Sequence, residues 1–231
     1  MPKAGGFTIT SPPSKATPTT GAPGYLELAI QKSPDNPPAA WLWKPESEIL
    51  NQELNVRIGG SFVWPPAGVP LSSIRKLVLV AGGVGINPLM SILSSVSDDP
   101  VPECEVHMLY SIKYPGPERT AEGLLFLERI AAIFAREKVT GSLKLYLTGS
   151  EGRSDANAGN RDVISCNEID VPFSRDRISV RDVEAIIGQD TSSSVVYVCG
   201  LPTMTDAFVQ ELTTAGEFGM EASRVLYEKW W

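Results

Sequence analysis

Three glycines, Gly82, Gly83 and Gly85, have the spacing in this chain that most clearly suggests chemistry, because they follow a short apolar run and precede Asn87 and Pro88. Glycine lets the backbone turn tightly and approach a ligand closely. An Asn-Pro pair favours a helix start, since the side-chain oxygen can cap free N–H groups and the proline ring already has a helical φ. Such a helix N-terminus attracts phosphate or pyrophosphate, so the turn predicts a dinucleotide site.

The turn differs from the usual G-x-G-x-x-G pattern, because Pro88 stands where the third glycine would be. Glu103 and Glu105 would lie at the start of the next strand, whereas a ribose-binding acid belongs at its end. A glycine turn can also serve only to let a helix pack close to a strand, and both interpretations stay open here. The candidate cofactor-binding residues of the turn are Gly82, Gly83, Val84, Gly85, Ile86, Asn87 and Pro88.

A second group, Cys-Gly-x-Pro-x-Met, follows the strand-like run at 195–199. Its candidate residues are Cys199, Gly200, Pro202 and Met204, of which we interpret Met204 as packing rather than chemistry. In a doubly wound sheet of order 3-2-1-4-5, strands one and four are neighbours, and ligands bind where the winding reverses between them. This arrangement would bring both turns to one crevice.

Alternating strand and helix patterns from residue 76 onward must position these turns. Strands are expected at 76–81, 105–111, 143–148, 195–199 and 224–228, and helices at 88–96, 122–138, 180–187 and 204–215. The predicted fold class is therefore α/β, a doubly wound parallel sheet of five strands. Residues 149–177 are polar and rich in glycine and aspartate, so we expect a surface insertion there.

The first 72 residues have a different pattern, with strand-like runs at 7–11, 25–31 and 54–58 separated by segments rich in proline, glycine and serine. Three strands are too few to close a barrel. We therefore expect a partial antiparallel β-barrel domain over 1–72 and a nucleotide-binding α/β domain over 73–231.

Composition and charge exclude several classes of protein. The net charge of -7 gives no reason to expect a nucleic acid partner, and no apolar run is long enough to span a bilayer. Cys104, Cys166 and Cys199 lack metal-ligand spacing, and His107 is the single histidine, so we expect no metal site and a reducing compartment. The first residues show no targeting segment, which predicts an intracellular protein, mitochondrial or cytoplasmic.

Several motifs together resemble the ferredoxin reductase family, whose flavin domain precedes its nucleotide domain. They are the stretch 76–91 and the motif at 199–204. The segments 6–11, 37–41, 57–60, 81–88 and 227–231 look more closely like those of the oxidoreductase NAD-binding domain-containing proteins of animals and their fungal relatives. This similarity covers nearly the whole chain apart from the insertion.

The resemblance implies roles for matching residues. The glycine turn would hold the pyrophosphate of a nicotinamide dinucleotide, Tyr110 and Ser111 would lie beside that nucleotide, and Cys199 would contact the nicotinamide carbon that yields the hydride. The alternative for Cys199 is an inert buried cysteine. A flavin, FAD, would bind along Phe7, Thr8, Ile9 and Ser11, with Trp230 over its other face; the alternative for these aromatic residues is ordinary core packing.

Two departures from the family pattern concern the flavin. Gly5 stands where the family has an arginine that holds flavin phosphate, and the segment 36–39, Asn-Pro-Pro-Ala, replaces a glycine-serine turn, although prolines offer no N–H groups. The opening strands of the flavin barrel would also precede Met1.

The function implied by the resemblance is an NAD(P)H-dependent flavoprotein oxidoreductase that passes hydride from nicotinamide to FAD and then electrons to an acceptor, such as a redox protein. The alternatives are a nucleotide-binding or interaction protein that has lost flavin chemistry and a truncated form of the enzyme. Lys113 or Arg153 could bind an extra phosphate, but Glu151 would oppose it, so NADH is favoured over NADPH.

Overall fold

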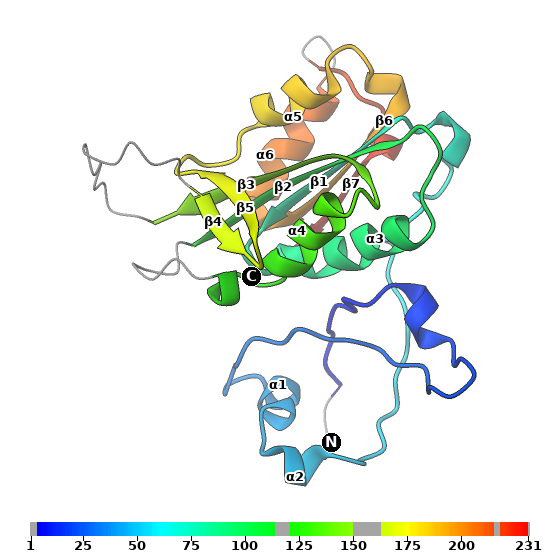
Figure 1. Cartoon of the computed structure of the whole chain (residues 1–231), viewed down its shortest axis with the longest axis vertical. Helices are drawn as coiled ribbons and strands as arrows, with labels where there is room; N and C mark the ends of the chain where they lie inside the picture. The colour runs from blue at the N-terminus through cyan, green and yellow to red at the C-terminus, as the bar shows by residue number, and fades with distance from the viewer. Residues whose placement is uncertain (1–3, 114–120, 150–162, 215–217, 231) are drawn as a thin grey trace.

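A seven-stranded sheet forms the centre of the protein (Figure 1). The computed structural model describes residues 4–113, 121–149, 163–214 and 218–230. The strands are β1 (Lys76–Gly82), β2 (Glu105–Lys113), β3 (Thr140–Thr148), β4 (Val163–Cys166), β5 (Ile169–Ser174), β6 (Ser194–Gly200) and β7 (Val225–Lys229), in the spatial order β4-β5-β3-β2-β1-β6-β7. All neighbouring strands are parallel except the antiparallel pair β4 and β5.

Strand β1 occupies the middle of the sheet because its sequence is apolar on both faces. Leu77, Val78, Leu79, Val80 and Ala81 are all fully buried. A strand with helices on both faces requires such a continuous apolar run, whereas a half-exposed strand alternates apolar and polar residues. The run that precedes the glycine turn therefore fixes the end of β1 at the middle of the molecule.

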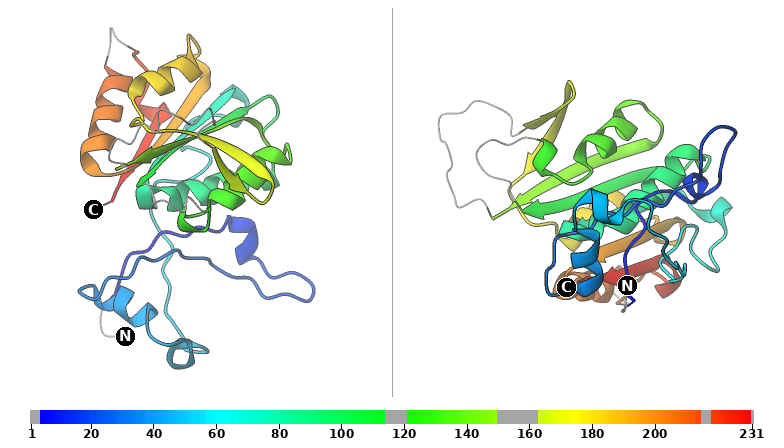
Figure 2. Two further views of the ribbon diagram at one scale, coloured as in Figure 1. Left: turned by 60° about the vertical axis from the view of Figure 1, so that its left-hand side comes forward. Right: turned by 90° about the horizontal axis from the view of Figure 1, so that it is seen from below.

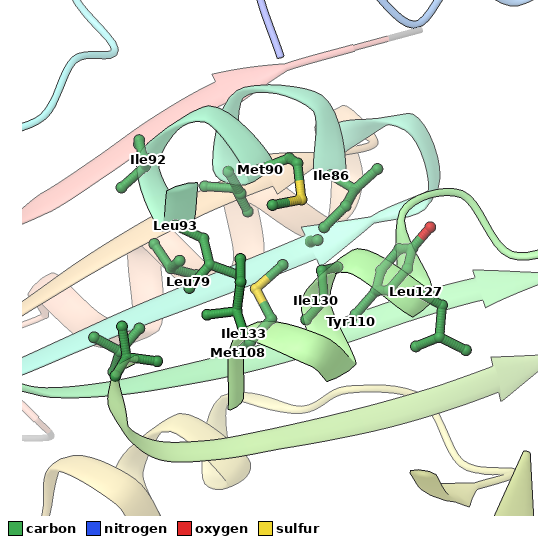
Figure 3. Close-up of a cluster of buried hydrophobic side chains, with 14 of the residues drawn as sticks. Leu79, Ile86, Met90, Ile92, Leu93, Met108, Tyr110, Leu127, Ile130 and Ile133 are labelled. Atoms are coloured by element: carbon green, nitrogen blue, oxygen red, sulfur yellow. The ribbon is translucent and has the colours of Figure 1, made fainter. Parts of the chain in front are cut away.

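Helices cover both faces of the sheet. Helix α3 (Ile86–Asp98) and helix α4 (Leu127–Ala135) pack on one face, while α5 (Val180–Ile187) and α6 (Pro202–Thr213) pack on the other (Figure 1). Figure 3 shows the core beneath α3 and α4, where Leu79 and Met108 of the sheet meet Met90, Leu93 and Ile130 of the helices. Burying a side chain of this size contributes roughly 1.5–3 kcal/mol, so this layer holds α3, and the turn before it, in place.

The prediction of a five-strand sheet is wrong in its strand count. The five expected strands are present and lie in the order β3-β2-β1-β6-β7, but a hairpin of β4 and β5 extends the sheet beyond β3. This hairpin belongs to the stretch predicted as a surface insertion, of which residues 150–162 lie outside the described residues. Asn167 and Glu168 form its turn at φ 47° and 70°. Ile164, Cys166 and Val171 are buried in the core, which explains why the segment pairs with the sheet despite its polar composition.

The prediction of a partial β-barrel is not supported by residues 4–75, which contain no strand. They hold the short helices η1 (Pro13–Ala16), α1 (Pro37–Leu42), α2 (Glu46–Ile49) and η2 (Leu71–Ser73), and two isolated bridges, Ile9 with Leu28 and Thr19 with Ala22. The alternating residues Leu54, Val56 and Ile58 are 50–64% exposed. Alternation predicts a strand only where a neighbouring strand and an apolar surface are available, and this segment has neither.

The first part of the chain lies on the α3 and α4 side of the sheet, as Figures 1 and 2 show. Polar contacts with α3 and α4 hold it there, including one that Ser14 donates to Asp98 at 3.1 Å. Ser91 of α3 donates to the carbonyl of Ser11 at 2.8 Å, Asn87 donates to the carbonyl of Ala29 at 2.9 Å, and Arg129 of α4 pairs with Glu27 at 2.8 Å. In addition, the buried Tyr197 hydroxyl of β6 donates to the carbonyl of Val63 at 2.6 Å.

Candidate functional site

The glycine turn after β1 and the end of β6 meet at the middle of the sheet. A Cβ atom placed on Gly85 would clash with the carbonyl group of Cys199 and would lie 2.8 Å from the amide nitrogen of Gly200. All of these contacts are to backbone atoms, so only glycine fits at this position without a backbone shift. The structure therefore brings the two predicted turns together, as the order of the parallel strands requires.

Met204, in the first turn of α6, completes this contact from the other side. A Cβ atom on Gly82 would lie 2.9 Å from the Met204 sulfur, and one on Gly200 would lie 3.3 Å from the same atom. The thioether thus covers both glycines. This position agrees with the interpretation of Met204 as a packing residue, although it also places the side chain at the junction of the two turns.

The backbone of the turn is partly accessible and leads directly into α3. Residues Gly83–Gly85 form a single 3₁₀ turn, Gly83 has a φ of +56°, and Val84 is 41% exposed. Ile86 and Pro88 are buried against the core, so the exposed part of the turn consists of Gly82, Gly83 and the side chain of Val84. The first N–H groups of a helix have no partner within the helix, and they carry partial positive charge.

The predicted helix cap by Asn87 is wrong. Helix α3 begins at Ile86, two residues before the expected start at Pro88, with Gly85 at its N-cap and no side-chain cap. The Asn87 amide instead donates to Ala29 of the N-terminal segment, and its Oδ1 is buried without a hydrogen-bond partner among the described residues. Burying a hydrogen-bond acceptor without a donor costs free energy, and a hydrogen bond from a polar ligand or a water molecule beside the turn would remove this cost.

Tyr110 and Ser111 differ in what they can offer to a ligand. Tyr110 is fully buried, and its hydroxyl donates to the carbonyl of Leu125 at 3.2 Å; burial raises the pKa of this phenol. Its side chain belongs to the core shown in Figure 3 and is not available to a nucleotide in this structure. Ser111 is partly exposed and lies opposite Gly82 in the β1–β2 register, so it remains a candidate.

Cys199 is fully buried at the end of β6. Burial raises the pKa of its thiol far above the ordinary value, and the carboxylate of Glu228 acts in the same direction. Such a thiol stays protonated at neutral pH, so Cys199 is a small neutral side chain rather than a nucleophile. Because the thiol is fully covered, a nicotinamide ring can contact it only after a neighbouring group moves.

Trp230 is a neighbouring group that contacts Cys199. Its backbone N–H donates to the carbonyl of Gly200 at 2.9 Å. Its indole nitrogen is buried without a hydrogen bond of good geometry among the described residues, yet it faces both Cys199 and Glu228 and lowers the pKa of each against the larger effect of burial. Trp230 therefore lies beside the end of β6, and its expected contact with a flavin stays a prediction.

Sequence reasoning missed Glu228. This residue lies opposite Cys199 in the β6–β7 register, and burial raises the pKa of its carboxyl. The signal was present in the sequence, since Glu228 ends a strand that is expected to lie beside the Cys199 strand, but a single acid without a partner is not recognisable as part of a site.

The residues expected to bind a flavin form a short extended segment rather than a barrel strand. Phe7, Thr8 and Ile9 are partly buried, and only Ile9 forms a bridge, with Leu28. Ser11 is buried; its hydroxyl accepts from the backbone N–H of Glu27 at 3.1 Å, and its carbonyl accepts from Ser91. The polar groups of Ser11 thus connect the N-terminal segment to itself and to α3.

The two departures from the flavin-binding pattern contact each other. A Cβ atom on Gly5 would lie 2.6 Å from the Cβ of Pro38 and 3.0 Å from the ring of Phe7. An arginine would not fit at this position, and Pro37 and Pro38 have no N–H groups to donate. These residues do not fit the diphosphate of FAD. The glycine turn, with its close backbone approach and the unpaired Asn87 oxygen, does fit a nicotinamide dinucleotide.

No group of three or more metal-ligating side chains occurs within the described ranges. None of the helices in those ranges is long and apolar enough to cross a membrane. Lys113 is exposed at the end of β2, whereas Glu151 and Arg153, on which the choice between NADH and NADPH depends, lie outside the described residues.

The fold and the site together define a class: an α/β nucleotide-binding protein with a glycine turn at the reversal point of a parallel sheet. Solved structures share this fold. The CS-b5R domains of human Ncb5or (NAD+ form) match with a TM-score of 0.57 at 16% identity, over 96% of this chain and 54% of that one. The ferredoxin reductase in carbazole 1,9a-dioxygenase matches with a TM-score of 0.55 at 16% identity, over 97% of this chain and 55% of that one.

The chain belongs to the oxidoreductase NAD-binding domain family, whose model matches residues 79–210. Over 232 residues it is 31% identical to the oxidoreductase NAD-binding domain-containing protein 1 of Homo sapiens, a match that covers 98% of this chain and 65% of the relative. The chain thus spans about two thirds of the length of this relative. The resemblance to the oxidoreductase NAD-binding domain-containing proteins is therefore confirmed, and the ferredoxin reductase in carbazole 1,9a-dioxygenase shares the fold.

Proposed function

We propose that the chain is the nicotinamide dinucleotide-binding unit of an NAD(P)H-dependent oxidoreductase. The observation that carries this proposal is the close approach of Gly85 to the backbone of Cys199 and Gly200 at the start of α3. The family model supports it, because it covers both turns. Gly82 and Gly83, which carry no side chains, are also partly exposed, so the backbone of the turn is accessible to a ligand.

The residues of the turn would hold the dinucleotide by its backbone. The N–H groups that open α3 would donate to the pyrophosphate, where the helix dipole also stabilises negative charge. The Asn87 oxygen would accept a hydrogen bond from the nucleotide, and Ser111 would lie beside Gly82 as a further polar contact. The nicotinamide supplies the hydride when the nucleotide is bound. We favour NADH over NADPH on the grounds given by the sequence.

The region of Cys199, Glu228 and Trp230 would receive the nicotinamide ring. Cys199 is covered in this structure, so the indole of Trp230 would have to leave before a ring could pack against the thiol. Glu228 has a raised pKa because of burial and would be the protonatable group closest to that position. The role of the protein is to orient the ring and to exclude water.

The acceptor of the hydride is a separate question. An FAD acceptor, with a redox protein after it, is the expectation that the family resemblance gives, but the packing of Gly5 against Pro38 does not fit an FAD diphosphate. A second candidate function follows from that packing: a nucleotide-binding protein without flavin chemistry. We therefore derive no step through a flavin.

Binding measurements on the purified chain would test both candidates. Calorimetric titration with NADH, NADPH and FAD is expected to show binding of NADH, with NADPH weaker. Absence of both NADH and NADPH binding would contradict the proposal. Recovery of a flavin spectrum after addition of FAD, bleached by anaerobic NADH, would support the enzyme with flavin, whereas NADH binding without FAD binding would support the second candidate.

A further inference from the structure

A cavity of about 230 Å³ lies between the N-terminal segment, the last turns of α3, and helix α4 with the residues that follow it. Its lining includes Pro12 and Lys15 from the segment, Ser94 and Asp98 from α3, and Arg129 from α4. It is distinct from the glycine turn, because the turn precedes the first residue of α3 and the cavity lies at the other end of the helix. At 1.5 Å of rise per residue, Ile86 and Ser97 are about 16 Å apart.

The lining is strongly cationic in a protein whose net charge is -7. Four cations, Lys15, Arg129, Arg136 and Lys138, line the cavity against one acid, Asp98. They come from two parts of the chain: Lys15 belongs to η1, Arg129 to the first turn of α4, and Arg136 and Lys138 to the residues that follow α4. Such a gathering is not expected from composition, because acidic residues outnumber basic ones here by 27 to 20.

Most of this charge has no counter-charge nearby. Arg129 pairs with Glu27 and also donates to the Ser94 hydroxyl at 3.2 Å. Among the residues that the structure describes, no ion pair involves Lys15, Arg136 or Lys138.

Asp98 compensates only part of this charge, because it also accepts a hydrogen bond from Ser14 at 3.1 Å. The carbonyl end of α4 attracts cations too, which explains part of the clustering. A helix end carries only about half an elementary charge, however, and it cannot balance three unpaired cations. Lys15, moreover, does not belong to α4. The cavity therefore has an excess of positive charge that a bound anion would neutralise.

We propose that this cavity binds a small phosphate-type polyanion, such as a diphosphate or a sugar phosphate. Arg136 can donate to phosphate oxygens in a bidentate manner, and Lys15 and Lys138 provide point-charge donors, whereas both terminal nitrogens of Arg129 already donate to Glu27 and Ser94. The cavity has room for a small molecule but lacks the long row of cations that a nucleic acid backbone requires. A ligand here would also connect Lys15 of the N-terminal segment to the end of α4, and so would hold the segment against the helices.

The test uses inorganic pyrophosphate as the probe, at constant ionic strength maintained with KCl. Pyrophosphate is expected to raise the thermal midpoint of the chain and to bind in a calorimetric titration. The double variant Arg136→Gln/Lys138→Gln removes two exposed cations and is expected to weaken this binding at least tenfold. NADH binding is expected to stay unchanged, since the cavity and the glycine turn are separate.

Two controls make the result specific. The double variant Arg57→Gln/Arg181→Gln removes the same amount of charge from exposed positions elsewhere and is expected to leave pyrophosphate binding within twofold. Gly85→Ala, which disturbs the nucleotide turn, is expected to retain pyrophosphate binding. The proposal is overturned if the wild-type chain does not bind pyrophosphate, or if both double variants lose binding equally. Loss of binding in Gly85→Ala alone would place the phosphate in the nucleotide turn instead.

Discussion

Replacement of Gly85 by alanine is the sharpest test of the proposed nucleotide turn. The new methyl group would clash with the backbone carbonyl of Cys199 and approach the Gly200 nitrogen to 2.8 Å. The clashing atoms belong to the Cys199–Gly200 end of β6, a fully buried strand between β1 and β7, so they have little freedom to move. Overpacking in a core costs about 1–3 kcal/mol, and we expect the upper end of this range here.

The expected loss of stability is large enough to measure directly. A loss of about 3 kcal/mol corresponds to a fall of roughly 6–12 °C in the thermal midpoint of a domain of this size. The backbone displacement that relieves the clash would move the turn away from β6 and change the direction of the N–H groups of the turn. NADH affinity should therefore fall at least about tenfold, or ~1.4 kcal/mol. Thermal unfolding followed by circular dichroism and calorimetric titration with NADH would measure the two effects.

Neighbouring glycines provide matched controls. Alanine at Gly83 would meet no atom within 4 Å but would have to adopt a φ of +56°, which costs about 1–2 kcal/mol. Alanine at Gly82 would meet the flexible end of Met204 at 2.9 Å, so its effect should be relieved by Met204→Ala in the same chain. We therefore expect Gly85→Ala to be the most destabilising of the three single variants.

Two results would refute this reasoning. If Gly85→Ala unfolds within 2 °C of the wild type, the close approach of the turn to β6 is wrong. If it is destabilised as expected but binds NADH with unchanged affinity, after correction for the folded fraction, the glycine serves packing and the turn is not a nucleotide cradle.

Three further predictions concern the candidate site and the contact of the N-terminal segment with α4 through Glu27 and Arg129. Trp230→Ala should increase the rate of alkylation of Cys199, mapped by mass spectrometry, because the indole faces the buried thiol; an unchanged rate would show that other groups cover it. Cys199→Ala should lower the rate of NADH oxidation with an artificial acceptor far more than it lowers NADH affinity, whereas equal losses would indicate a packing role. Burial raises the pKa of the Glu27 carboxyl, but hydrogen bonds from Arg129 and Thr10 outweigh burial, so the pKa is lowered from its ordinary value of 4.5. The contact of Glu27 with Arg129 therefore stabilises the fold at a pH above 4.5, and this stabilisation is lost as the pH falls through the lowered pKa. The protection of residues 4–31 against hydrogen exchange, relative to the intrinsic exchange rate at each pH, should therefore fall in acid, and Glu27→Gln should show less of this pH dependence; an equal response in both chains would contradict the assignment.

Elements with strong local patterns were predictable from the sequence. The apolar run at 76–81 predicted a strand of a parallel sheet, which became β1, and the predicted helix at 180–187 became α5, which begins with a capping box of Ser179 and Asp182. The meeting of the two glycine turns followed from the strand order, since neighbouring parallel strands end at the same edge of the sheet.

Elements that depend on distant partners were not predictable. The hairpin of β4 and β5 lies in a polar segment whose few apolar residues, such as Ile164 and Val171, become significant only because the core lies beneath them. Conversely, Leu54, Val56 and Ile58 have strand-like alternation but no strand beside them, so the pattern gave a false prediction. Asn87 has the sequence of a helix cap, yet the carbonyl of Ala29, 58 residues away, takes its amide.

The sequence alone determined the class of the sheet, the position of the glycine turn and the family, because each of these depends on residue type at short spacing. Only the tertiary structure decided which side chains the site contains. It buried Tyr110 and covered Cys199, it placed Glu228 opposite that cysteine, and it filled the space beside Gly5 with Pro38. The physical reason is that burial and pKa are set by neighbours brought together through folding, which no local pattern encodes.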